Sequence, residues 1–300
     1  MRHSEKAQSL SSLCTLLGYS RQALHQYNKN SCKEVFEEEL VIQEVKKHRV
    51  LQPRLGTRKL AVKLCDFVSG HNMKMGRDAL FRLLREQDLL VRRRKRKVQT
   101  TFSKHWLKKY PNLIREYIPT APNTLWVSDI TYIVANGGFA YLSLVTDAYS
   151  RKIVGFWLSE TLEAAGSVKA LGMALKSCKN TKYLIHHSDR GVQYCSKDYV
   201  KMLTKNGVKI SMTENGDPLE NAIAERVNGI LKQELLRDKY DGFEAARKDI
   251  AKAVAIYNSL RPHLSCDMLT PDEAHQKTGE LAKKWKNYYK KPDGQMETSE

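Results

Sequence analysis

The spacing of apolar side chains changes along this chain, from a helical period in its first third to a strand period further on. Leucine, valine and alanine recur every three or four positions over residues 7–17, 34–48 and 57–68, and again from about residue 76. This spacing predicts helices, with Ser20 capping a further short helix through Gln26. Residues 69–72 (Ser-Gly-His-Asn) predict a turn between the last two helices. A helix, a glycine-bearing turn and a second helix are typical of a DNA-binding helix-turn-helix, although such hairpins also occur in proteins that bind no DNA.

From residue 125 onward the chain is rich in valine, isoleucine, threonine and tyrosine. Short runs predict strands over residues 125–134, 139–146, 153–158, 183–187 and 208–212. Helical spacing predicts helices over 162–177, 197–205, 219–236 and 243–257. Three antiparallel strands followed by alternating helices and strands indicate a mixed α/β layer.

These patterns divide the chain into five parts. We expect an N-terminal helical segment (1–33), a helix-turn-helix-like domain with a basic arm (34–97), a linker (98–122), an α/β domain (123–280) and a polar tail (281–300). The linker is inferred from the absence of a clear period and from Pro111, Pro119 and Pro122.

Charge is distributed unevenly over the 300 residues. Residues 1–120 carry 26 Lys and Arg against 11 Asp and Glu, and residues 121–300 carry 25 against 22, within a net charge of +18. A basic front part joined to a nearly balanced back part indicates a module that binds a polyanion, most simply nucleic acid; a merely soluble basic surface is the alternative.

The candidate DNA contacts lie in this basic part. Arg77 is available on the outer side of the second helix of the hairpin. It is followed by six consecutive cations, namely Arg92, Arg93, Arg94, Lys95, Arg96 and Lys97. Such a run is usually a solvated extended arm, and beside a DNA-reading helix it is placed to follow phosphates.

The cysteines and the hydropathy indicate the cell compartment. The six cysteines form no Cys-x-x-Cys pair and no zinc-type spacing with histidine, which is typical of reduced thiols in a cytoplasmic protein. We expect no membrane association, because no apolar run approaches the length of about 18 residues needed to span a bilayer.

Three carboxylates form the candidate chemistry. Asp129 lies within an apolar strand, Asp189 follows a strand end, and Glu225 lies on the polar face of the helix over 219–236, together with Asn221 and Lys232. Hard oxygen ligands suit Mg²⁺, and two such ions support phosphoryl transfer. Taken singly, an edge aspartate, a turn aspartate and a solvated glutamate explain these residues equally well.

Three longer strings decide between these interpretations. They are Trp126-Val-Ser-Asp-Ile-Thr-Tyr132, His187-Ser-Asp-Arg-Gly-Val-Gln-Tyr194 and Glu220-Asn-Ala-Ile-Ala-Glu225. Together with Tyr257-Asn-x-x-Arg-Pro-His263 and Thr270-Pro271, they closely resemble the OrfB-type transposase of the IS3 group of bacterial insertion sequences. The resemblance spans about residues 34–275. Glu220 departs from it, since many members have Asp there, and no counterpart of the family's first-frame product is evident.

The resemblance implies a fold, an activity and partners. It implies an RNase H-like integrase core, a mixed sheet with flanking helices, preceded by an all-α helix-turn-helix domain. Asp129, Asp189 and Glu225 would form a DDE triad that binds Mg²⁺, with Mn²⁺ able to substitute, and Lys232 would be its basic residue. Asn221 and Lys232 would contact DNA.

The implied activity is metal-dependent cleavage and strand transfer on double-stranded DNA, at the element ends and at a target. A homo-oligomer on DNA is expected, and the upstream-frame product is a further candidate partner. The alternatives are an RNase H-like nuclease that does not join ends, and a DNA-binding regulator derived from a transposase.

Overall fold

The computed structural model describes residues 9–91, 105–214 and 218–284. The chain forms two compact units, Met1–Arg92 and Arg93–Glu300, and each is described here by itself. No helix among these described residues is both long enough and apolar enough to cross a membrane.

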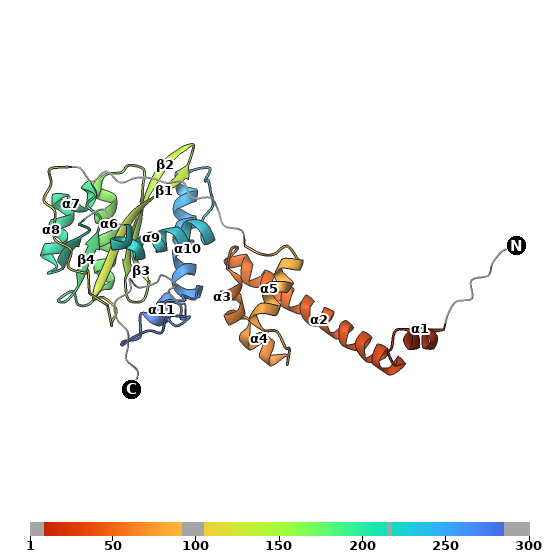
Figure 1. Cartoon of the computed structure of the whole chain (residues 1–300). Helices are drawn as coiled ribbons and strands as arrows, with labels where there is room; N and C mark the ends of the chain where they lie inside the picture. Colours follow the sequence, from red (N-terminus) through yellow and green to blue (C-terminus); the bar gives the residue numbers. More distant parts are fainter. Residues whose placement is uncertain (1–8, 92–104, 215–217, 285–300) are drawn as a thin grey trace, which may run out of the picture. The chain divides into compact units, whose positions relative to one another are not determined.

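The first unit is helical. Its elements are α1 (Leu10–Leu16), α2 (Arg21–Leu51), α3 (Thr57–Lys63), α4 (Cys65–Gly70) and α5 (Arg77–Glu86). The Ser20 side chain caps α2 by accepting a hydrogen bond from the Ala23 amide. The helix then continues through residue 51, so the boundary expected between residues 33 and 34 falls inside one helix (Figure 1).

The hairpin expected over residues 57–86 is formed by three helices. The expected helix over 57–68 is interrupted at Leu64, where α3 ends and α4 begins, and α5 starts directly after Gly76. Leu60 and Leu64 from the first part pack with Leu80 and Leu84 of α5 against the C-terminal part of α2. Burial of these leucines is the main stabilising contribution to the hairpin.

The second unit contains a five-stranded sheet. Its strands are β1 (Leu125–Ala135), β2 (Gly138–Asp147), β3 (Ile153–Ser159), β4 (Ile185–Ser188) and β5 (Lys209–Met212). Their order is β3-β2-β1-β4-β5. β1, β2 and β3 pair antiparallel, whereas β4 runs parallel to both β1 and β5. The sheet is mixed, as the sequence predicts.

Helices cover both faces of this sheet (Figure 1). They are α6 (Ala164–Ser177), α7 (Val192–Cys195), α8 (Lys197–Lys205), α9 (Ala222–Ile230), α10 (Phe243–Leu260) and α11 (Pro271–Ala274). A 3-10 turn, η1 (Pro218–Asn221), precedes α9, and a π-helical turn, η2 (Leu231–Leu235), follows it. The long helix expected over residues 219–236 is therefore a composite of three helix types.

Alternation along β1 assigns its side chains to the two faces. Trp126 packs with α6 and α8 on one face, whereas Ile133 and Ala135 pack with α9, η2 and α10 on the other. Because side chains in a strand alternate, the odd-numbered Asp129 and Thr131 face the α9 side. Ser128 faces the opposite side, where it meets His186.

Part of the expected linker belongs to the second unit. Leu107 and Tyr110 pack against the core formed with α6 and α8. The Met212 amide of β5 donates to the Pro111 carbonyl at 3.2 Å, and the Leu113 amide donates to Ser211 Oγ at 2.9 Å. Proline and the absence of periodicity indicate a segment without helix or strand, but they do not reveal that this segment binds a sheet edge. Residues 98–104 lie outside the described ranges.

Candidate active site

Asp129 occupies the middle of β1, opposite Leu144 of β2. Its Oδ1 accepts a hydrogen bond from the Ile130 amide at 2.8 Å, and its Oδ2 accepts one from Asn228 Nδ2 at 2.7 Å. Both bonds stabilise the ionised carboxylate. They also fix its orientation toward α9, the helix that carries Glu225.

The parallel pairing of β1 and β4 brings Asp189 beside Asp129. Val127 lies opposite His187 in this pair, so Asp129 and Asp189 both stand two residues beyond the paired positions. Neighbouring strands are about 4.8 Å apart, so the two carboxylates are neighbours. Asp189 Oδ1 also accepts from the Gly191 amide at 2.9 Å, which forms the turn into α7. The turn interpretation of Asp189 is therefore confirmed, and its role in a metal site stays a prediction that this position allows.

Glu225 lies on α9, which packs against β1 on the face that Asp129 also occupies. Ala224 packs with Leu125 and Val127, which holds this helix against the strand. The Glu225 side chain itself is exposed. Glu225 therefore faces away from the apolar contact, as its position on the polar side of the predicted helix indicates.

The pKa of Asp129 depends on the charges of the other two carboxylates. Burial, then the negative charge of Asp189, and more weakly that of Glu225, raise the pKa of Asp129 to about 7. The hydrogen bonds from Asn228 and Ile130 act in the opposite direction. Like charges collected in a partly buried position favour a bound cation, because the cation restores the ionised form.

The donor set fits hard divalent ions. Carboxylate oxygens are the ligands that Mg²⁺ prefers, and this ion usually takes only one or two of them from protein. Among the described residues, no group of three or more His, Cys, Asp or Glu side chains is arranged around one ion position. A site in which each of two ions takes two carboxylates needs no such group.

Lys232 lies on the next turns beyond Glu225. It belongs to η2, and its Nζ donates to Thr131 Oγ1 of β1 at 3.3 Å. Burial lowers the pKa of Lys232, while the negative charge of Asp129 raises it. The lysine therefore contacts β1 at Thr131, two positions beyond Asp129.

Asn221 does not have the position expected for a DNA contact. Its side chain is buried, and Nδ2 donates to the Ser128 carbonyl of β1 at 3.0 Å. In this structure the Asn221 amide therefore binds the strand, and its contact with DNA stays a prediction. The Asn221 side-chain amide joins η1 to the strand that carries Asp129. The helical period of the sequence does not show whether such a polar side chain is buried or exposed.

Two residues outside the expected site support it. Asn228 binds Asp129 directly, and its signal in the sequence is its position three residues after Glu225 on the same helix face. Glu220, which departs from the resembled family, accepts from the Glu214 amide at 2.7 Å and from Asn112 Nδ2 at 3.2 Å. The longer glutamate side chain thereby joins the chain before η1 to the segment around residue 112.

His186 and His187 are packing residues rather than ligands. His186 Nε2 bonds with Ser128 Oγ at 2.8 Å and with Tyr199 Oη at 2.9 Å, on the α8 side of the sheet. His187 Nδ1 bonds with Ser211 Oγ at 2.8 Å. Burial lowers the pKa of His186 to about 3 and that of His187 to about 4, so both are neutral at physiological pH. They cross-link β1, β4 and β5 beneath the carboxylates.

The candidate DNA-binding residues of the first unit are only partly described. Arg77 is the first residue of α5, is exposed, and pairs with Asp78 at 2.9 Å. Arg92, Arg93, Arg94, Lys95, Arg96 and Lys97 lie outside the described residues.

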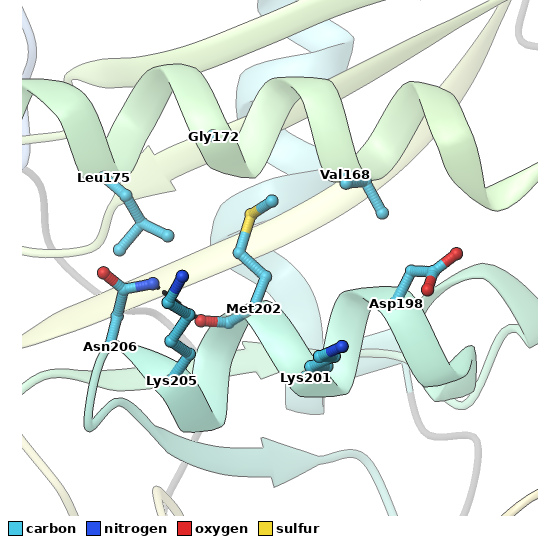
Figure 2. Close-up of a pocket in the computed structure, with 8 residues that line it drawn as sticks. All are labelled: Val168, Gly172, Leu175, Asp198, Lys201, Met202, Lys205 and Asn206. Atoms are coloured by element: carbon cyan, nitrogen blue, oxygen red, sulfur yellow. Dashed lines mark hydrogen bonds between the residues drawn. The ribbon is translucent and has the colours of Figure 1, made fainter.

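A shallow pocket between α6 and α8 is separate from the carboxylates. It is lined by Val168, Gly172 and Leu175 from α6 and by residues of α8 including Met202 and Lys205 (Figure 2). None of the three carboxylates lines this pocket. The candidate active site lies instead where β4 ends beside the middle of β1, on the side of α9.

Comparison with known proteins agrees with this geometry. Two integrase core domain families match residues 119–218 and 206–271. A 31 kDa protein of insertion element IS600 from Shigella sonnei is 33% identical over 275 residues, covering 90% of this chain and 100% of that protein. The transposase InsF for insertion sequence IS3A from Escherichia coli (strain K12) is 32% identical over 197 residues, covering 65% of this chain and 68% of that protein.

A solved structure is also similar. The HTLV-2 integrase catalytic core domain in complex with magnesium is 20% identical to this chain, with a TM-score of 0.43. The alignment covers 53% of this chain and 100% of that chain.

The matched domains and the sheet define the second unit as an RNase H-like integrase core, the fold of polynucleotidyl transferases that act on DNA. The extent of the match to IS600 and IS3A proteins makes the assignment more specific. The chain belongs to the IS3 group of insertion-sequence transposases.

Proposed function

We propose that Asp129, Asp189 and Glu225 form the catalytic triad of this transposase and hold two Mg²⁺ ions, for which Mn²⁺ can substitute. The observation that carries this proposal is the pairing of β1 with β4, which brings Asp129 and Asp189 to neighbouring positions, with the Glu225 helix packed against β1. The pKa of Asp129, raised to about 7 by burial and by the charges of the other two carboxylates, agrees with it. The three carboxylates come from the middle of β1, from the residue after β4 and from α9, which packs against β1. Asp129 would be a ligand of both ions, and Asp189 and Glu225 of one each.

The proposed reaction has two steps on DNA. Water attacks a phosphodiester at the element end, and the bond to the 3′-oxygen breaks to leave a free 3′-hydroxyl. That hydroxyl then attacks a phosphate of the target, so one phosphodiester forms as another breaks. The two ions, when bound, activate the attacking oxygen and stabilise the leaving one.

The protein's own residues position this chemistry. Asn228 and the Ile130 amide orient Asp129 through bonds of 2.7 and 2.8 Å. Lys232 would contact a DNA phosphate beside the carboxylates; the bond from its ammonium to Thr131, on the same side of β1 as Asp129, supports this. No nucleophile of the protein takes part, since Asp and Glu serve as metal ligands.

The first unit is proposed to hold the DNA. Arg77 lies at the start of α5, the last of the three helices over residues 57–86, in the position where a recognition helix of a helix-turn-helix protein contacts base edges. The six cations of residues 92–97 would follow phosphates with little sequence preference. We further propose that the chain acts as a homo-oligomer on the element ends in the cytoplasm, with the upstream-frame product as a candidate partner.

Conservative substitutions test the triad. Asp129→Asn, Asp189→Asn and Glu225→Gln each remove a metal-binding charge at nearly constant shape. We expect each variant to lose cleavage and joining of duplexes that carry the terminal sequences of the chain's own element, with DNA binding close to wild type. A variant that keeps substantial Mg²⁺-dependent activity would remove that residue from the triad. A nuclease without joining activity would be revealed by cleavage that yields no strand-transfer product.

A further inference from the structure

The turn that carries Lys232 has an unusual conformation. Residues 231–235 form a π-helical turn, in which the Leu236 amide donates to the Leu231 carbonyl at 2.8 Å. Such turns are rare, cost stability relative to an α-helix, and occur frequently at functional sites. A turn of this kind persists where neighbouring side chains hold it.

One side of the turn is attached to β1. Lys232 Nζ donates to Thr131 Oγ1 at 3.3 Å, and Leu231 is fully buried in the core beside the strand. Residues two apart in a helix project roughly 160–200° from one another, since a turn holds about 3.6 residues in an α-helix and more in a π-helix. Glu234 therefore projects away from Lys232.

The other side of the turn is held by a buried ion pair. Arg261, at the C-terminal end of α10, donates from Nε to Glu234 Oε2 at 2.8 Å and from Nη2 to Glu234 Oε1 at 2.7 Å. The Arg261 side chain is only 2% exposed, whereas that of Glu234 is 21% exposed. A bidentate contact of this type fixes both distance and orientation.

Arg261 is itself held in place by its surroundings. Its Nη1 donates to His263 Nε2 at 3.0 Å, and the guanidinium lies over the Tyr257 ring, 5.9 Å from the centroid. Tyr257 Oη in turn donates to the Arg151 carbonyl, and Asn258 exchanges two hydrogen bonds with the backbone of Ile153 in β3. The guanidinium is therefore anchored to the far edge of the sheet.

We propose that Glu234 and Arg261 are positioning residues that hold the π-helical turn and thereby fix the Lys232 ammonium beside the triad. This inference rests on the proposed function for the role of Lys232 in DNA contact. In this proposal the pair acts through the lysine. It gives the Tyr257–His263 motif a function in the active site that its distance along the chain does not suggest.

The first experiment measures the position of Lys232 without metal or DNA. Full-length wild type, Glu234→Gln and the double variant without either charge, Glu234→Gln with Arg261→Met, are acylated by an amine-reactive reagent, and the rate at Lys232 is measured by peptide mass spectrometry. We expect the rate to change severalfold in both variants, because release of the lysine alters both its accessibility and its pKa, which burial lowers in the wild type. The matched control is Glu244→Gln, which breaks the exposed pair with Arg247 on α10 at 2.8 Å without touching the turn.

The second experiment places the pair and the lysine in one pathway. Strand transfer with the element-end duplex is measured for Glu234→Gln, Lys232→Ala and the double variant. We expect each single change to lower the rate about tenfold, the effect of losing one charge-assisted contact, and the double variant to be no slower than Lys232→Ala. Thermal unfolding shows that each variant is folded at the assay temperature.

Two results would overturn the inference. An unchanged Lys232 acylation rate in both variants would show that the pair does not hold the lysine. The second result is strand transfer by the Glu234→Gln, Lys232→Ala variant that is slower than that of Lys232→Ala by the full factor that Glu234→Gln causes alone. That result would show that the pair acts independently of the lysine. If the wild type joined no DNA, the proposed function would fail, while the acylation rates would still test the positioning.

Discussion

Asn228 donates a hydrogen bond from Nδ2 to Asp129 Oδ2 over 2.7 Å, joining two residues 99 positions apart in the sequence. This bond lowers the pKa of Asp129 against the larger effects of burial and of the Asp189 charge. The amide therefore favours the ionised carboxylate that a metal ion needs.

The first prediction is that Asn228→Ala weakens activity by about tenfold or more, the usual effect of removing a residue that orients a metal ligand. Without the bond the pKa of Asp129 rises further, so the acidic limb of the pH–rate profile should move to higher pH. Rates of cleavage measured from pH 6 to 9 at saturating Mg²⁺ check this. Asn206→Ala, on the end of α8, is the control, and a profile identical to wild type would contradict the assignment.

The raised pKa of Asp129 also affects stability. In the folded protein its pKa is about 7, above the ordinary value of 3.8. A raised carboxyl pKa contributes stability that is fully present below pH 3.8 and is lost as the pH rises through about 7. His186 and His187, with lowered pKa values, contribute in the opposite sense, because their stabilisation is lost as the pH falls below 6.5.

The second prediction isolates the Asp129 contribution by difference. In EDTA, Asp129→Asn should be more stable than wild type at pH 8 by up to a few kcal/mol, since each pKa unit corresponds to about 1.4 kcal/mol. The advantage should shrink toward pH 5, and Mg²⁺ should stabilise wild type more than the variant. Urea unfolding at both pH values measures this. A pH-independent difference would show that Asp129 titrates normally.

The third prediction concerns the basic arm. Replacing Arg92, Arg93, Arg94 and Lys95 by Ala should weaken binding to every duplex. It should also reduce the slope of log K against log salt by about 3–4, if each residue neutralises one phosphate. Anisotropy titrations at several salt concentrations measure the slope. Replacing the three arginines by Lys keeps the charge and should keep the slope. An unchanged slope in the alanine variant would identify the run as a solvated connection.

The fourth prediction follows from the contacts of residues 105–113. A fragment of residues 105–300 should unfold at a higher temperature than one of residues 121–300. The shorter piece loses the apolar contacts of Leu107 and Tyr110 and the hydrogen bonds to β5. Circular dichroism melting of both fragments tests this, and equal midpoints would show that the segment contributes no stability.

The fragments also test the division of labour between the units. We expect residues 1–92 with the adjoining arm (1–104) to prefer element-end DNA over random duplex. Residues 105–300 should show at most non-specific nicking, because nothing remains to place the scissile phosphate. Selection of the correct ends by residues 105–300 alone would contradict this division.

The sequence by itself determined the local elements and the chemistry. The runs of strand-forming residues over 125–134 and 139–146 and the helical spacing over 162–177 and 197–205 depend on neighbours along the chain, so the strands and helices follow from the sequence. The three carboxylate strings similarly identify the family, which the match to the IS600 and IS3A proteins confirms.

Tertiary structure decided which partner each polar residue of one helix face binds. Asn221, Asn228 and Lys232 share a period, yet the first is buried against the Ser128 carbonyl, the second binds Asp129 and the third reaches Thr131. Their partners lie about 100 residues earlier. The π-helical turn and the pairing of residue 111 with β5 likewise depend on contacts between distant segments. Periodicity records which side of a helix is polar, but the groups that meet that side are decided only when the sheet and its helices pack together.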